Sequence, residues 1–142
     1  MPDEARDDSI LLITGASLRA EEMDRPLAYR LRDEILSRLG ADSSWKCHVI
    51  TDVLYLNSEN LHARPAISIG GPGVNGAAQY LLARLPHALA VDNVLLIQMD
   101  VKMEDNRCSI WGMDHDTMVE AIDTFIEKGY LNRFLIGVRQ AL

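Results

Sequence analysis

Short, largely apolar runs that end at a glycine constrain the fold of this chain more than any other feature. Residues 10–14 (ILLIT) run into Gly15, and residues 66–69 (AISI) run into Gly70. A strand that is apolar on both faces is typical of the interior of a parallel sheet, where helices cover both sides. The chain is therefore expected to form an α/β domain.

Strand-like and helix-like segments alternate along the rest of the chain. In residues 25–39 apolar side chains recur every four residues, which predicts an amphipathic helix with Asp24 as its cap. A short turn joins segments 94–101 and 107–112, which predicts an antiparallel hairpin. Strands are expected at 10–14, 48–52 (or from Lys46), 66–69, 94–99 and 108–112, and helices at 25–39, 75–85, 117–129 and 130–142, with a loop at 15–23 and no assignment for 53–65.

This order predicts a Rossmann-like three-layer sandwich. Its sheet is expected to be mainly parallel, with about five strands and an antiparallel hairpin at the edge. A chain of 142 residues is the length of one domain, so residues 10–142 are expected to form a single α/β domain after a flexible acidic tail at 1–9.

Composition excludes several classes of partner. The chain has 21 acidic and 14 basic residues and a net charge of −7, which argues against duplex nucleic acid. No apolar run reaches the roughly 18 residues of a membrane span, and no signal-peptide pattern is present. The sequence therefore predicts a cytoplasmic protein without a membrane partner. Cys47 and Cys108 have neither zinc-site nor redox-motif spacing and are expected to be buried, reduced thiols.

The loop at residues 70–76 (GGPGVNG) is the strongest functional signal. Its glycines permit close backbone approach, and the free amides and dipole of a following helix attract an anion. Ligands of open α/β sheets bind at the carboxyl ends of strands, so the loop after residues 10–14 is expected to line the other side. The predicted ligand-binding residues are Thr14, Gly15, Ser17, Gly70, Gly71, Gly73, Asn75 and Gly76. The alternative is a tight turn that only packs a strand against a helix.

Three carboxylates are weak catalytic candidates. Glu21 and Glu22 lie in the expected loop at 15–23 and could act as a general base, beside Arg19, which could pair with an anion. Asp52 follows the second strand, where an acid can accept hydrogen bonds from ribose hydroxyls. The alternative for each of them is a charged side chain exposed to solvent, without a catalytic role. The sequence identifies neither a reaction nor a cofactor.

The acidic triplet Asp114-His115-Asp116 could in principle ligate a metal ion. Acids at the start of a helix are already explained by capping and by the helix dipole, however. The expected cap is Asp116 or Thr117, with Thr117 and Glu120 as a capping box. The sequence therefore predicts no metal site.

Two segments resemble elements of known modules. Residues 69–75 (IGGPGVN) resemble the strand–Gly-Gly-Pro-x-x-Asn–helix element of Rossmann-like modules in surface-layer proteins, and the cell-wall-binding type 2 repeat has a similar Gly-Gly-Pro element. Residues 111–114 (WGMD), followed by Thr117 and Ala121, are similar to the strand-Gly-x-Asp-x-x-Thr-x-x-Ala element of these modules. The resemblance implies a Rossmann-like fold with paired loops, and no cell-wall function.

Three functions remain open at this point. The first is a module that binds or senses a small anionic ligand, such as a nucleotide or a sugar phosphate. The second is a nucleotide or nucleoside hydrolase or transferase on the same scaffold. The third is an interaction or assembly domain, in which the apolar segment 130–142 packs on another copy or on a partner protein.

Overall fold

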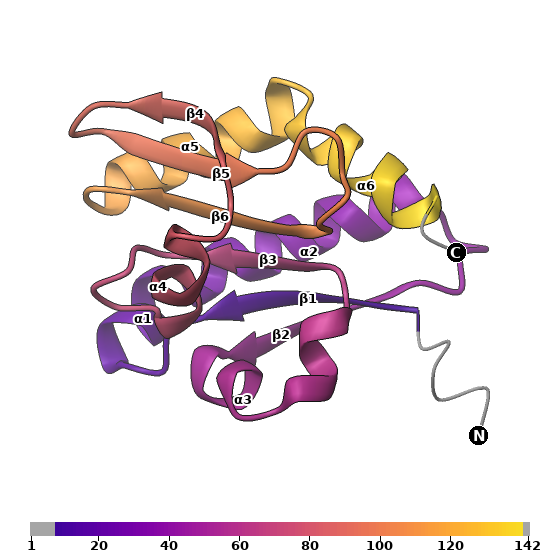
Figure 1. Cartoon of the computed structure of the whole chain (residues 1–142), viewed down its shortest axis with the longest axis horizontal. Coiled ribbons are helices and arrows are strands. Elements are labelled where there is room, and N and C mark those ends of the chain that lie inside the picture. The colour runs from indigo at the N-terminus through magenta and orange to yellow at the C-terminus, as the bar shows by residue number, and fades with distance from the viewer. Residues whose placement is uncertain (1–7, 141–142) are drawn as a thin grey trace.

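The computed structural model describes residues 8–140, which form one six-stranded sheet with helices around it (Figure 1). Most of the predicted acidic tail and the last two residues lie outside the described residues. The strands are β1 (Ser9–Thr14), β2 (Lys46–Thr51), β3 (Ala66–Ile69), β4 (His87–Val91), β5 (Leu95–Met99) and β6 (Arg107–Gly112). The helices are α1 (Leu18–Met23), α2 (Arg25–Leu39), α3 (Asp52–Leu56), the 3-10 helix η2 (Glu59–Ala63), α4 (Gly76–Leu82), α5 (His115–Glu127) and α6 (Tyr130–Gln140).

The sheet is mixed, with a parallel body and an antiparallel edge. Its strand order is β2-β1-β3-β6-β5-β4. The first four strands in that order are parallel, whereas β5 is antiparallel to β6 and β4 is antiparallel to β5. The predicted α/β class and antiparallel hairpin are therefore confirmed. The sequence analysis assigns no strand to β4, because this edge strand is mostly exposed and its apolar run is only four residues long.

Helices cover both faces of the sheet because its central strands are apolar on both sides. Leu12 and Ile67 belong to a large core that also contains residues of α2, α5 and α6. Leu11 and Ile13 point to the opposite face, where they pack with Tyr55 of α3 and with α4. Figure 1 shows α3 and α4 in front of the sheet and α2 and α5 behind it. None of the described helices combines the length and apolarity that a membrane span requires.

Two segments without a predicted helix contain short helices. Residues 15–23, expected as a loop, include α1, whose N-cap Ser17 accepts a hydrogen bond from the amide of Ala20 at 3.2 Å. Residues 53–65 hold most of α3 and all of η2. Helices this short show too few turns for an apolar periodicity to be visible in the sequence.

The apolar C-terminal segment belongs to the core of this chain. Phe134, Leu135 and Val138 of α6 are buried. Among the described residues of α6, Ile136 is the one large apolar side chain that is exposed. The residues that suggested packing on another chain are therefore largely used within this one.

The side chain of Asn75 joins the two central strands at their carboxyl ends. Its amide nitrogen donates hydrogen bonds to the carbonyl oxygens of Ile13 in β1 and Ile69 in β3, both at 3.0 Å. Its oxygen accepts hydrogen bonds from the amides of Ala77 and Ala78 at 2.9 and 3.3 Å, which caps α4. The residue is 1% exposed, so these four bonds form out of contact with solvent.

We expect Asn75→Ala to lower the free energy of unfolding by about 2–4 kcal/mol, because it leaves several buried backbone groups without partners. Asn75→Asp should also destabilise, since a carboxylate cannot donate to the two carbonyls. Urea denaturation measures both changes. Gln79→Ala, on the exposed surface of α4, is the control and should be nearly neutral. Equal effects of the substitutions at 75 and 79 would contradict the assigned role.

Both cysteines are buried free thiols, as the sequence predicts. Burial raises the pKa of Cys47 to about 12 and also raises the pKa of Cys108. Because the thiolate is the reactive form, we expect neither cysteine to react with a thiol reagent near neutral pH until urea unfolds the protein. Mass spectrometry of labelled protein measures this. Labelling of the folded protein as fast as that of the unfolded protein would contradict it.

Candidate functional site

A cleft of about 270 Å³ opens at the carboxyl ends of β3 and β6. One wall is the glycine-rich loop that precedes α4, and another is the first turn of α5. The junction between α1 and α2 supplies the third wall. Figure 1 shows α1 and the loop before α4 at this end of the sheet, on the left. The cleft therefore lies at the carboxyl ends of parallel strands, the end of an α/β sheet at which ligands bind.

Asp24 contributes a buried carboxylate to this cleft. It stands between α1 and α2 in the right-handed helical conformation and is 8% exposed. Although Asp24 is the N-cap residue of α2, its side chain accepts no capping hydrogen bond, and no other described residue donates one to it. Burial raises the pKa of the Asp24 carboxyl, and the nearby His115 and Arg19 oppose this shift. A buried carboxylate without a structural partner is typical of a functional site.

Arg19 and the amino end of α5 make another part of the cleft electropositive. Arg19 is exposed and forms no ion pair with the described part of the chain. His115 is the first residue of the 13-residue helix α5, so the positive end of the helix dipole faces the cleft. The Nδ1 atom of His115 is buried without a described partner. The amides of Gly71 and Gly73 donate to no other described group.

Apolar side chains form much of the remaining lining. They include Met23, Met113 and Met118 and the indole ring of Trp111. A Cβ atom on Gly71 would lie 3.5 Å from this ring, so the glycine-rich loop packs directly against the indole. Apolar walls limit access of water and strengthen the hydrogen bonds that a ligand forms with the polar groups.

Three of the predicted ligand-binding residues line the cleft, namely Gly70, Gly71 and Gly73. Gly70 has a φ of +114°, and a Cβ atom there would lie 2.7 Å from an oxygen of Asp24. The site therefore needs glycine at this position for both backbone conformation and space. Gly73 is exposed, and a Cβ atom there would meet nothing within 4 Å. A larger residue at Gly73 would reach into the mouth of the cleft without disturbing the fold.

The other predicted ligand-binding residues do not line the cleft: Thr14, Gly15, Ser17, Asn75 and Gly76. A Cβ atom on Gly15 would lie 1.9 Å from the carbonyl oxygen of Val74, so the two loops touch each other. The amides of Asn75 and Gly76 donate to Gly71 and Asp52, and the side chain of Asn75 is fully bonded. The crevice between β1 and β3 is therefore filled by the protein itself.

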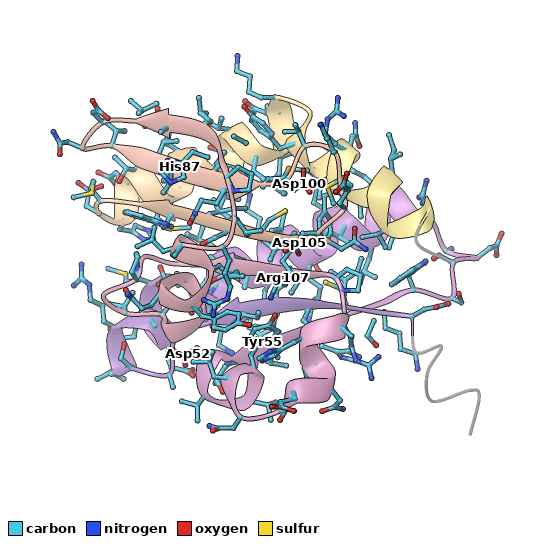
Figure 2. The ribbon with its side chains drawn as sticks, viewed as in Figure 1. Asp52, Tyr55, His87, Asp100, Asp105 and Arg107 are labelled. Carbon is cyan, nitrogen blue, oxygen red and sulfur yellow. The ribbon has the colours of Figure 1, made fainter. Side chains whose placement is uncertain are left out.

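None of the predicted catalytic carboxylates lines the cleft. Glu21 and Glu22 are exposed on α1, where Glu21 forms an ion pair with Arg25 at 3.4 Å. Asp52 is buried and accepts hydrogen bonds from two backbone amides, one of them that of Gly76 at 2.7 Å. Figure 2 shows Asp52 where α3 meets α4. The hydrogen-bonding capacity that the sequence analysis offered to a ribose is thus used to hold two helices together.

The acidic triplet at the start of α5 caps this helix. Asp114 accepts a hydrogen bond from the amide of Thr117, and its own amide donates to the Thr117 hydroxyl, both at 2.9 Å. The predicted cap at Asp116 or Thr117 is wrong, because Asp114 and Thr117 form the capping box. These hydrogen bonds lower the pKa of Asp114. The described residues include no group of three or more acidic, histidine or cysteine side chains that could hold a metal ion.

Sequence reasoning missed the cleft roles of Asp24, His115 and Trp111. It expected Asp24 to cap α2, but α1 continues into this residue and keeps it helical, so the side chain turns to the cleft. An aspartate that caps a helix and one that turns into a cleft look the same in the sequence. The difference here depends on α1, which is too short to be predicted from a local pattern. Nothing in the sequence around Trp111 and His115 distinguishes them from ordinary core or helix-capping residues.

No protein-family model matches the chain, and no curated protein matches it either. The function is therefore inferred from the geometry of the cleft.

We expect Asp24→Asn to stabilise the protein at neutral pH by about 0.5–2 kcal/mol, the size of a typical stabilising substitution, because it removes a buried carboxylate that accepts no hydrogen bond from the described residues. The folded protein disfavours the Asp24 carboxylate, so the penalty is absent below the ordinary aspartate pKa of about 3.9. The penalty grows as the pH rises through the higher pKa of the folded state. Thermal unfolding of both proteins from acid to neutral pH measures the difference.

Asp52→Asn is the matched control, because Asp52 is equally buried but accepts two hydrogen bonds. This change should destabilise by about 1–3 kcal/mol, since one backbone amide then faces an NH₂ group. Destabilisation by both substitutions would show that Asp24 serves the fold rather than the cleft.

Proposed function

We propose that this protein binds or senses a small anionic ligand of the nucleotide or sugar-phosphate kind in the cleft, on a Rossmann-like three-layer scaffold. The observation that carries the proposal is a cleft lined by two charged side chains, Asp24 and Arg19, that make no hydrogen bond with the described part of the chain. Arg19 and the amides of Gly71 and Gly73 would hold the anion, with the dipole of α5 behind them. The buried free thiols of the chain are compatible with a cytoplasmic location.

The burial of the polar groups suggests how the ligand is oriented. Arg19 and Gly73 are exposed at the mouth of the cleft, whereas Asp24 is buried. The charged end of the ligand would therefore stay at the mouth, where desolvation costs least. Its uncharged part would enter between Met23, Met118 and Trp111.

The volume of the cleft favours the smaller members of this ligand class. Clefts for drug-sized ligands enclose about 300–1,000 Å³, and this cleft has about 270 Å³. A single sugar phosphate suits this space better than a dinucleotide.

A hydrolase or transferase is the second candidate. The observation that favours it is the buried Asp24 carboxylate, whose raised pKa suits proton transfer, next to the imidazole of His115. In this alternative Asp24 takes the general-base role that the sequence analysis gave to Glu21 or Glu22. Turnover that Asp24→Asn abolishes while ligand binding persists would support catalysis.

We expect thermal shift to detect ligand binding when the protein is screened against inorganic phosphate, glycerol 3-phosphate, ribose 5-phosphate and nucleoside monophosphates. A ligand at about 100 times its Kd adds about 2.7 kcal/mol of stability. Arg19→Ala should weaken binding at least about tenfold, since a charge-assisted hydrogen bond contributes roughly 1.5–3 kcal/mol. Gly73→Val should block the mouth of the cleft without unfolding the protein.

Lys128→Ala, at the far end of α5, is the control for the loss of a positive charge. It should leave both Kd and melting temperature unchanged. The absence of any shift across the phosphate panel, or equal weakening by Lys128→Ala and Arg19→Ala, would contradict the proposed site.

A further inference from the structure

We propose that Asp24 selects hydroxylated ligands, so that the anion bound in the cleft is a polyol or sugar phosphate rather than a simple phosphate. In this arrangement a ligand hydroxyl donates a hydrogen bond to the Asp24 carboxylate while the phosphate lies near Arg19. The inference rests on the proposed function and specifies the substrate class of the same cleft.

The fold makes room for this carboxylate but gives it no partner. Gly70 borders it, and a Cβ atom there would lie 2.7 Å from an Asp24 oxygen. The amide of Gly70, which could otherwise serve as a donor, bonds to the carbonyl oxygen of Ile110 at 3.0 Å. The carboxylate is therefore surrounded by backbone and cleft, and a donor must come from the cleft side.

The two buried aspartates of the described chain show what is unusual about Asp24. Asp24 stands between α1 and α2 and Asp52 begins α3, and their exposures are similar at 8% and 9%. Asp52 accepts two backbone hydrogen bonds, whereas Asp24 accepts none from the described residues. The Asp24 carboxylate borders the cleft, so a ligand bound there can supply the donor that the described residues do not.

The charges around Asp24 favour a neutral hydroxyl over an ammonium group as this donor. Arg19 and His115 already lie close enough to lower the pKa of Asp24 against the effect of burial. An ammonium group would bring a further cation next to them, whereas a hydroxyl donates to the carboxylate without added charge. Hydrogen bonds from a hydroxyl to a carboxylate are short and about twice as strong as neutral ones.

The test compares matched phosphates on the full chain by isothermal titration calorimetry. Propyl phosphate and glycerol 3-phosphate have the same carbon chain and differ in two hydroxyls, and phosphoethanolamine replaces a hydroxyl donor with an ammonium group. We expect glycerol 3-phosphate to bind the wild-type protein about tenfold tighter than propyl phosphate, which corresponds to about 1.4 kcal/mol. Ribose 5-phosphate should likewise bind tighter than its 2-deoxy counterpart.

Substitutions then assign the preference to one side chain. Asp24→Ala should reduce the hydroxyl preference to less than about threefold, and Asp24→Asn should give an intermediate value. Arg19→Ala should weaken both phosphates by the same factor and keep the preference. Melting temperatures of both Asp24 variants show that they are folded.

The outcomes separate this inference from the proposed function. Equal affinity of the wild-type protein for both phosphates, a preference that survives in Asp24→Ala, or tighter binding of phosphoethanolamine than of glycerol 3-phosphate would overturn the role of Asp24 alone. Failure of every phosphate to bind the wild-type protein would overturn the proposed function and this inference with it.

Discussion

Two carbonyl oxygens at the carboxyl ends of β1 and β3 would lack donors if the side chain of Asn75 did not lie between them. The same side chain caps α4, so one residue sets the spacing of the central strands and the start of a helix. The crevice where a sheet of this kind ordinarily binds ligands is filled as a result. The cleft that remains lies one strand further along the sheet, between β3 and β6.

One part of the glycine-rich loop forms hydrogen bonds within the protein, and another part lines the cleft. Its second half turns into α4, and its amides bond within the protein. Its first half, from Gly70 to Gly73, faces the cleft and packs against Trp111. The tight-turn and ligand-binding interpretations of this loop are therefore compatible, because each describes a different part of it.

Asp24 and Asp52 differ in how the fold supports their carboxylates. The carboxylate of Asp52 is stabilised by backbone amides, and its helices depend on that contact. The carboxylate of Asp24 is buried without such support, so the folded state is less stable than it would be with a neutral side chain. Natural proteins retain such groups mainly where a ligand or a reaction uses them.

Local patterns in the sequence were sufficient for the α/β class, the apolar central strands, helix α2 and the glycine-rich loop. Each of these depends on apolar periodicity or on the backbone preference of single residues, which act over a few positions. The edge strand β4, the short helix α1 and the lining of the cleft required the tertiary structure. Asp24 and Asp52 have the same chemistry, and only the folded chain decides their roles. The amide of Gly76 donates to Asp52 at 2.7 Å, whereas the amide of Gly70, which borders Asp24, is bonded to Ile110 in β6.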